Sequence, residues 1–289
     1  LATEAELLVA LQHLDEEQLS EVATGLDRGV FIPVAASDDS CFDYSPAQKL
    51  SFAKATKGKK KWQRRFAKKQ KGSANRRKAT TKIGRYDCKI ADIRNDFAHK
   101  TSKAIVDAAG SLLVFENLKI KNMTASAKGI MEKPGKNVRQ KAGLNRAILH
   151  SSWGNIKIYT KYKGLKQGKL TIFVPAAYSS QECSECGYSH KDNRETQSEF
   201  ICQACGFVCN ADINAAQVIK KRGIRAVLDN KVGIKVPKKI SLRRAGTVQT
   251  DAQASKPVER VSVLSVSRPL SSSRGNRKKP TPKIDAVSI

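Results

Sequence analysis

Apolar residues recur along the chain at two spacings, one typical of helices and one typical of strands. Leucines at helical spacing near the amino terminus predict one amphipathic helix over residues 3–21. Trp62 and Phe66, four residues apart, give the next helical segment a narrow apolar stripe, and Gly72 marks a turn, so two antiparallel helices are expected there. The other helical patterns cover residues 82–109, 144–159 and 210–222, with Asn210 as the N-cap of the last.

Short apolar runs between these helices predict β-strands. They lie at residues 31–36, 41–44, 112–115 and 170–174. Because strands alternate with helices, the sequence predicts an α/β protein built on a sheet. From about residue 240 the chain becomes rich in Ser, Pro and Arg, and we expect 240–289 to be a mostly disordered basic tail.

The charge of the chain is large and unevenly placed. Of its 289 residues, 54 are Lys or Arg and 26 are Asp or Glu, a formal net charge of +28. Residues 1–27 carry seven acids and no Lys or Arg, whereas residues 54–82 carry fourteen Lys and Arg and no acid. Such an excess favours a polyanionic partner, most often nucleic acid, although an anionic membrane surface stays open. The candidate phosphate-binding residues are Lys59, Lys60, Lys61, Arg64, Arg65, Lys68, Lys69, Arg76 and Arg77.

Four cysteines are spaced like the ligands of a zinc ion. The pairs Cys183/Cys186 and Cys202/Cys205 have Cys-x-x-Cys spacing and are separated by 15 residues. Four thiolates complete a tetrahedral site and leave no open position, which predicts a structural zinc in a reducing cell. Two surface disulfides fit less well without a secretion signal. His190 lies inside the loop and is an alternative ligand, although an ordinary exposed histidine fits its position better. Gly187 and Gly206 follow the two pairs, where a turn needs positive φ, and Cys41, Cys88 and Cys209 have no spacing partners.

Three acids stand beside predicted structural elements. Asp27 comes immediately before an apolar strand, Glu116 ends the apolar run 112–115, and Asp212 lies in the first turn of a helix. Asp212 could be no more than a partner of the helix dipole. Together, the acids in so basic a chain suggest a phosphodiesterase in which carboxylates hold Mg²⁺ and Lys and Arg position the nucleic-acid backbone.

The segments around these acids resemble a known family. The sequences GLDRGV around Asp27, VFENL around Glu116 and NADINAA around Asp212 are similar to the three RuvC-type motifs of TnpB/OrfB proteins, transposon-encoded RNA-guided DNA nucleases similar to type V CRISPR effectors. Residues 178–187 resemble the entry to that family's zinc ribbon, and residues 95–100 resemble its helix before the second acid. The resemblance covers about residues 22–225, in the order acid, acid, four cysteines, acid.

The resemblance implies an RNase H-like, RuvC-type mixed sheet with helices, an inserted basic helical hairpin and a Cys₄ zinc ribbon. Asp27, Glu116 and Asp212 would ligate two catalytic Mg²⁺ ions for DNA hydrolysis, with guide RNA from the transposon end as second partner. We expect a cytoplasmic, nucleoid-associated protein of a prokaryote or mobile element. The implied units are an acidic helix (1–21), a nuclease core (22–177) with an insertion at about 46–109, the ribbon (178–209), a final helix (210–239) and the tail (240–289).

One departure from the family leaves alternatives open. The family carries a region before the first acid that grips guide RNA and reads a DNA motif, but here the chain opens with Leu1 and only 26 residues precede Asp27. We therefore expect an N-terminally truncated member. A nuclease-inactive nucleic-acid-binding remnant is the main alternative. A zinc-ribbon transcription-type factor is another, but it would leave Asp27 and Glu116 without a role.

Overall fold

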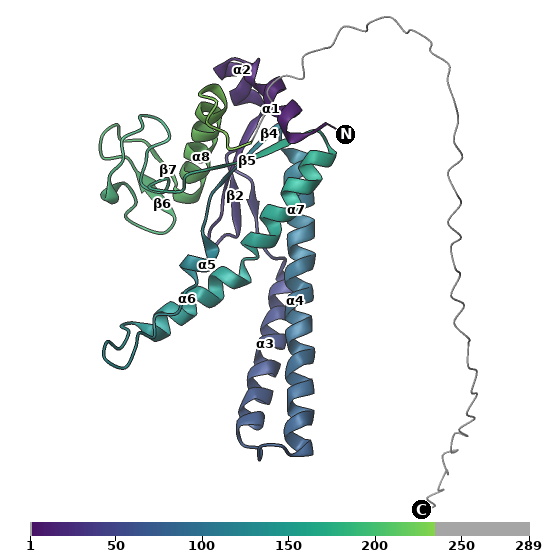
Figure 1. Ribbon diagram of the computed structural model, residues 1–289. Coiled ribbons are helices and arrows are strands. Elements are labelled where there is room, and N and C mark those ends of the chain that lie inside the picture. Colours follow the sequence, from purple (N-terminus) through teal and green to yellow (C-terminus); the bar gives the residue numbers. More distant parts are fainter. Residues whose placement is uncertain (1, 235–289) are drawn as a thin grey trace, which may run out of the picture. The chain divides into compact units, whose positions relative to one another are not determined.

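The computed structural model describes residues 2–234, which belong to one unit of the chain (Figure 1). The expected disordered tail, 240–289, lies outside the described residues. So does the end, 235–239, of the segment 210–239 expected as the final helix. None of the helices between residues 2 and 234 combines the length and hydrophobicity of a membrane span.

A five-stranded mixed sheet forms the centre of this unit, in the order β3-β2-β1-β4-β5. The β1–β2 and β2–β3 pairs are antiparallel, whereas β4 runs parallel to both β1 and β5. The α/β class predicted from sequence is therefore confirmed. The strands are β1 (Ala23–Asp27), β2 (Val34–Ala36), β3 (Cys41–Phe42), β4 (Leu112–Glu116) and β5 (Leu170–Val174).

Eight α-helices connect and cover these strands in the described part of the chain. Three of them begin with a capping box, in which the side chains of the N-cap and N3 residues each bind the other's backbone N–H. The helices are α1 (Glu4–Gln12), α2 (Glu16–Val22), α3 (Pro46–Ala67), α4 (Ala74–Ala108), α5 (Ile120–Met123), α6 (Val138–His150), α7 (Trp153–Lys166) and α8 (Ala211–Leu228).

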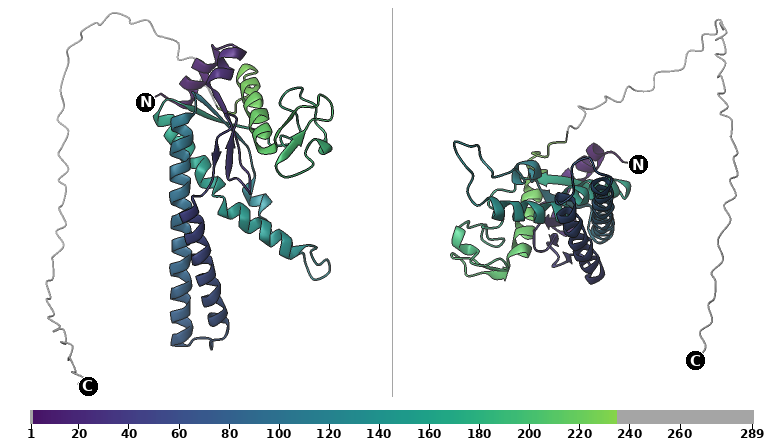
Figure 2. Two further views of the ribbon diagram at one scale, coloured as in Figure 1. Left: turned by 180° about the vertical axis from the view of Figure 1, so that it is seen from behind. Right: turned by 90° about the horizontal axis from the view of Figure 1, so that it is seen from below.

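Helices cover both faces of the sheet, which makes three layers (Figure 2). Alternate residues of β4 serve the two faces: Leu112 and Val114 pack with α8, α1 and α2, whereas Leu113 and Phe115 pack with α4 and α7. All four are fully buried. This explains why the strand appears in the sequence as an unbroken apolar run rather than an alternating one.

Helix α8 lies unusually close to the strands beneath it. A Cβ atom at Gly25 of β1 would lie 2.0 Å from the carbonyl oxygen of Ala216, and one at Gly223 of α8 would lie 2.3 Å from a methyl group of Val114. Both distances are far below van der Waals contact, so each position requires glycine. The two glycines fix how α8 sits on the sheet.

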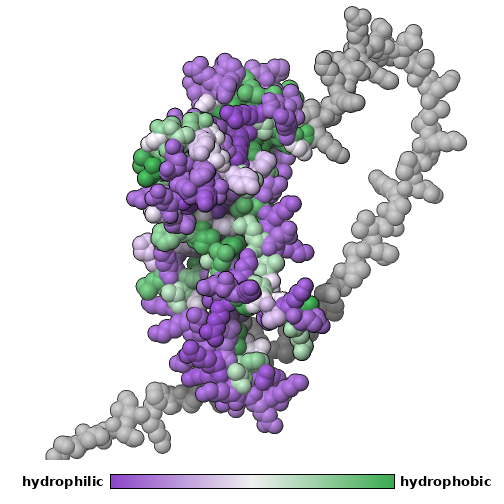
Figure 3. All heavy atoms as spheres, turned by 90° about the vertical axis from the view of Figure 1, so that its left-hand side faces the viewer, coloured by the Kyte–Doolittle hydropathy of each residue, from purple (hydrophilic) through white to green (hydrophobic). Residues whose placement is uncertain are grey.

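The helical hairpin predicted within the insertion is present. Helices α3 and α4 run antiparallel and extend away from the sheet, with their turn at residues 68–73 (Figure 1). The second helix begins at Ala74 rather than near 82, so both arms share the basic segment. In the view of Figure 3, hydrophilic residues cover the far end of the hairpin. Trp62 and Phe66 are half-buried beneath the guanidinium groups of Arg65 and Arg76.

Two single-helix predictions are wrong. The segment 3–21 is two helices, because Asp15 caps a new helix there by accepting a hydrogen bond from the Gln18 N–H. The segment 144–159 lies in α6 and α7, which meet at Ser152, a residue with a positive φ of 57°. Leucine spacing continues across the first break and apolar residues across the second, so periodicity alone hid both.

The strand that leads to Asp27 was also missed. Asp27 does not precede a strand but ends β1, whose residues Thr24 and Gly25 give it a weak apolar signal. The strand expected at 31–36 is confined to its last three residues, since the chain bends before Val34. The helix expected at 210–222 is longer, and Asn210 caps it as predicted by accepting from the backbone N–H groups of Asp212 and Ile213.

Replacing Gly25 with Ala is expected to lower the free energy of unfolding by at least about 1–3 kcal/mol, because the new methyl group would overlap a backbone carbonyl that cannot rotate away. Gly84→Ala is the matched control, since Gly84 lies on α4 with open space around it. That variant should be neutral or gain up to about 1 kcal/mol. Urea unfolding of both variants measures this, and equal stability would contradict the close packing of α8.

Candidate functional site

Two of the three predicted acids end adjacent parallel strands. Leu26 of β1 pairs with Phe115 of β4, and the next residue along each strand is Asp27 and Glu116 respectively. Because side chains alternate along a strand, both acids lie on the same face of the sheet as Gly25, the face that α8 covers. Glu116 is buried and Asp27 is half-buried.

The third acid comes from the helix over this face. Asp212 is one helical turn before Ala216, the residue that touches the sheet at Gly25. Its carboxylate reaches back over the strand ends, since a Cβ atom at Gly29 would lie 3.8 Å from Asp212 Oδ2. Asp212 is 7% exposed. The structure therefore places all three acids on one side of the sheet, beyond the ends of β1 and β4.

Two arginines pair with these acids. Arg28 is buried, and its Nε lies 3.6 Å from Glu116 Oε1, while its backbone N–H donates to the same oxygen at 3.2 Å. Its guanidinium also donates to the backbone carbonyl of Glu116. Arg194 approaches from the loop beyond the first cysteine pair, and its Nη2 donates to Asp212 Oδ1 at 2.9 Å. Each arginine neutralises an acid that would otherwise repel its neighbours.

Negative charge is nonetheless in excess at Asp27. Burial raises the pKa of Asp27 well above its ordinary value, and the charges of Glu116 and Asp212 raise it further, against the smaller opposing effects of Arg194 and Arg28. Burial also raises the pKa of Glu116, an effect that Arg28 opposes. A cation at this place would relieve the repulsion from Glu116 and Asp212 that adds to the effect of burial on the pKa of Asp27.

The four predicted cysteine ligands do converge. The Sγ atoms of Cys183 and Cys205 are 3.7 Å apart and those of Cys186 and Cys202 are 3.5 Å apart; all four lie within 4.8 Å of one another. Among residues 2–234 this is the one group of Cys, His, Asp or Glu gathered closely enough to hold a metal ion, and it includes neither His190 nor the three acids. The four thiols could therefore hold an ion as they stand.

The backbone around the thiols is shaped for ligation. The first knuckle (residues 183–187) and the second knuckle (residues 202–206) each end in a glycine with the predicted positive φ, 74° at Gly187 and 73° at Gly206. Burial raises the pKa of the Cys202 thiol, but backbone N–H groups of Cys205 and Ala204 and the neighbouring thiols bring it down to about 6. The short strands β6 (Glu199–Ile201) and β7 (Val208–Asn210) flank the second knuckle. Of the other cysteines, Cys41 and Cys88 are exposed and Cys209 is half-buried.

A groove of about 920 Å³ between α3 and α6 gathers part of the predicted basic set. We call it the basic groove. It includes five of the nine predicted residues and no acid, whereas Lys59 instead forms an ion pair with Asp87. Lys69, Arg76 and Arg77 lie at the hairpin turn, outside it. The residues lining it are Phe52, Ala53, Thr56, Lys57, Lys60, Lys61, Arg64, Arg65, Lys68, Arg146 and His150.

Several residues at these places were not singled out from the sequence. Arg28 had a signal, because it directly follows Asp27 within the GLDRGV segment. Arg194 had none, since nothing local indicates that a loop residue reaches a helix 18 positions later. Arg146 lies on α6, which joins the groove only in the folded chain.

Two family models match the chain. One, described as "Probable transposase" (OrfB_IS605), matches residues 6–127, and the other, "Cas12f1-like, TNB domain", matches residues 153–219. A protein of Escherichia coli K12 named "Putative RNA-guided DNA endonuclease InsQ" is 42% identical over 199 residues, 69% of this chain and 48% of that protein. The chain belongs to the TnpB/OrfB family.

Other members and relatives of the TnpB/OrfB family match less closely. A "Putative RNA-guided DNA endonuclease" of Streptomyces pristinaespiralis is 29% identical over 71% of this chain and 46% of its own length. The chain thus spans about half the length of these curated relatives. A solved Cas12f1–sgRNA–target DNA complex aligns with 70% of this chain and 50% of its own, at 19% identity and a TM-score of 0.43.

Asp27→Asn is expected to raise the free energy of unfolding at pH 7 in protein without added magnesium. The folded pKa of Asp27 is raised, so its ionisation costs stability as pH rises above the unfolded value near 4, and the gain should shrink as pH falls toward about 4. Urea unfolding across that range measures it.

The matched control is Asp96→Asn, an exposed acid of α4. The hydrogen bond from Lys100 lowers the pKa of Asp96, so this acid contributes stability at pH 7 and its replacement should give no gain. If Asp27→Asn were no more stable than the native chain at pH 7, the raised pKa of Asp27 would be refuted.

Proposed function

We propose that the chain is the RuvC-type nuclease part of a transposon-associated, RNA-guided DNA endonuclease, with Asp27, Glu116 and Asp212 as its catalytic acids. The observation that carries this proposal is their placement: two acids end adjacent parallel strands and a third faces them from α8. The motif order noted in the sequence and the names of the relatives agree with it.

The sheet supports an RNase H-like core. Antiparallel strands β3, β2 and β1 are continued by the parallel strands β4 and β5, and helices lie on both faces. Sites in sheets of this kind lie beyond the carboxyl ends of parallel strands. Asp27 and Glu116 are the last residues of β1 and β4, so the acids occupy that position.

The acids suit magnesium by their chemistry. Carboxylate oxygens are the ligands that Mg²⁺ prefers. After burial, the charges of Glu116 and Asp212 are what raises the pKa of Asp27, and a cation would offset these charges. Two ions bound there, as the resemblance to RuvC-type motifs implies, would stabilise the attacking and leaving oxygens of a phosphodiester. Arg28 donates a hydrogen bond to an oxygen of Glu116, and Arg194 donates one to an oxygen of Asp212. A metal ion that bound these oxygens would have to replace both hydrogen bonds.

The four cysteines suit a structural zinc ion. Their Sγ atoms lie within 4.8 Å of one another, thiolates are the ligands zinc prefers, and four of them fill its tetrahedral coordination. The segment they cross-link, from Cys183 to Cys205, has little core of its own beyond Phe200 and its neighbours. We therefore assign the ion a role in folding this segment, the zinc ribbon, rather than in chemistry.

The basic groove is the proposed path of a nucleic-acid backbone. Seven of its lining residues are Lys or Arg, and their mutual repulsion is relieved when phosphates replace small counterions. Phe52 and His150, whose rings meet edge to face with centroids 4.6 Å apart, add an aromatic surface. Such surfaces bind single strands without reading their sequence.

Guided recognition is proposed from the names of the relatives. Relatives named RNA-guided endonucleases are about twice as long as the matched part of this chain. The residues described here contain the acids, the cysteines and the basic groove. Binding of guide RNA is accordingly the part of the proposal that rests on the relatives alone.

Asp27→Ala and Glu116→Ala are each expected to lower Mg²⁺-dependent cleavage of single-stranded DNA by about a hundred-fold or more. Replacing a residue that only hydrogen-bonds to a metal ligand lowers activity roughly 10–100-fold, so replacing a ligand itself should lower activity at least as much. The matched control is Asp107→Ala, an exposed acid of α4 that pairs with Lys103. Gel assays of the purified variants decide the matter, and equal cleavage by all of them would refute the acid site.

A double substitution in the basic groove, Lys60→Ala with Arg64→Ala, should weaken binding of single-stranded DNA and make it less sensitive to salt. Losing two phosphate contacts makes the negative slope of log K against log salt shallower by about 1.4, since each contact to a single strand contributes about −0.7. The control, Lys100→Ala with Lys103→Ala, removes the same charge from residues that are paired with acids on α4. Fluorescence anisotropy at several salt concentrations compares them, and equal slopes would show that net charge matters and the groove does not.

A further inference from the structure

The side chain of Asn214, on α8, forms hydrogen bonds with the backbone on both sides of Cys183 in the first knuckle. Its side-chain oxygen accepts a hydrogen bond from the Ser184 N–H at 2.9 Å, and its side-chain nitrogen donates to the Glu182 carbonyl at 2.7 Å. These two backbone groups flank Cys183. Asn214 is completely buried, so neither bond competes with water.

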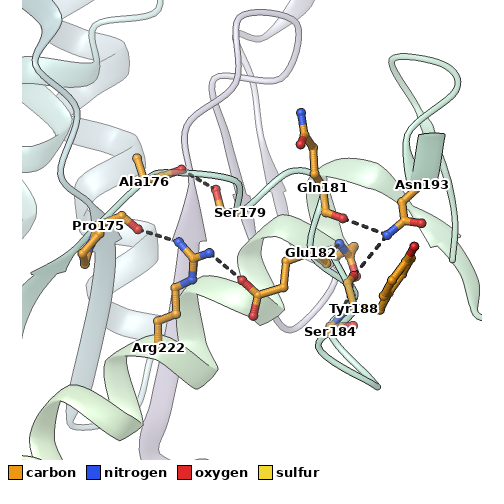
Figure 4. A network of polar contacts seen from close by, with 10 residues as sticks. Pro175, Ala176, Ser179, Gln181, Glu182, Ser184, Tyr188, Asn193 and Arg222 are labelled. Carbon is orange, nitrogen blue, oxygen red and sulfur yellow. Dashed lines mark hydrogen bonds and ion pairs between the residues drawn. The ribbon is translucent and has the colours of Figure 1, made fainter. Parts of the chain in front are cut away.

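Two further residues of α8 hold the same stretch. Arg222 donates to the Glu182 carboxylate and to the Pro175 carbonyl just after β5, which Figure 4 shows as a bridge between the sheet and the ribbon. Lys221 donates to the Ser184 carbonyl. The stretch from Glu182 to Ser184 is thus held to one helix by three side chains, of which Asn214 and Lys221 bind its backbone and Arg222 binds the Glu182 carboxylate.

The ribbon also joins α8 at the end that carries Asp212. Ala211, the first residue of α8, packs in the same cluster as Cys183, Cys202 and Phe200, and its N–H donates to the Ser198 carbonyl at 2.9 Å. Arg194 of the ribbon pairs directly with Asp212. Inside the ribbon, buried Asn193 ties the two knuckles together by donating to the Gln181 and Tyr188 carbonyls and accepting from the Gln203 N–H.

We infer that Asn214 is a positioning residue that couples the four-thiol site to Asp212. The inference rests on the roles proposed above for the thiols and for Asp212. With the thiols cross-linked by a metal ion, the first knuckle is rigid, and Asn214, two residues beyond Asp212, holds the start of α8 against it. Without the cross-link the knuckle loses its shape, and α8 loses the contacts that fix Asp212 over the strand ends.

The first test measures zinc retention in the full chain. The native protein should carry one zinc ion, and Asn214→Ala should release it to a chelator about tenfold faster or more. Asn214→Asp keeps the volume and the acceptor but loses the donor, so it should also release zinc faster even if the alanine variant fails to fold. The control is Ile219→Ala, which removes a buried side chain from the sheet-facing side of α8 and should lower thermal stability without faster release.

The second test measures Mn²⁺ binding at the acids by the paramagnetic resonance signal of the free ion, which requires no cleavage. Zinc-depleted native protein and Asn214→Asp should each bind Mn²⁺ several-fold more weakly than the zinc-loaded native chain. Unchanged zinc release in both Asn214 variants, or full Mn²⁺ affinity after zinc depletion, would overturn the coupling. If Asp212→Ala bound Mn²⁺ as tightly as the native chain does, the proposed acid site would be refuted rather than the role of Asn214. The rate of zinc release would then be the test of whether Asn214 positions the first knuckle.

Discussion

The close packing of α8 on β1 is the constraint on which the site depends. At Gly25 the backbone of the helix and the backbone of the strand approach so closely that no side chain fits between them. Asp27 lies two residues beyond this contact on the strand, and Asp212 lies one turn before it on the helix. This contact between backbones therefore brings together groups that are 185 positions apart in sequence, and the ribbon contacts of Asn214 then hold the first turn of α8 in place.

Charge balance limits what this geometry can hold. Three acids at one sheet edge are tolerated because Arg28 and Arg194 pair with two of them, and the third keeps its proton more readily than an ordinary aspartate. One arginine directly follows β1, the strand beside the one that carries its acid, and the other comes from the ribbon. The electrostatics of the site are thus shared between two parts of the fold, as its geometry is.

Much of this arrangement could be predicted from the sequence, for reasons specific to each element. The β4 and β5 strands, the turn of the hairpin and the cap at Asn210 carry local signals, namely apolar runs, a Gly-Ser pair and a capping side chain. The cysteine spacing indicated a cluster that the structure does form. The β1 strand was missed because its Gly25 is selected by contact with α8 and not by strand propensity, and the breaks at Asp15 and Ser152 interrupt apolar periodicities that continue past them. Arg194 and Asn214 act across the fold, and no local pattern marks them.

The ribbon lies within the connection between β5 and α8, residues 175–210. Its entry is held to α8 by Asn214 and Arg222, and its exit becomes the first turn of the same helix, so both ends of the inserted segment are fixed beside each other. A connection anchored in this way at both ends closes at a cost that grows only slowly with its length. The outer loop between the knuckles can consequently change in length or surface during evolution, provided that Asn193 keeps its contacts with both knuckles and Arg194 its contact with Asp212.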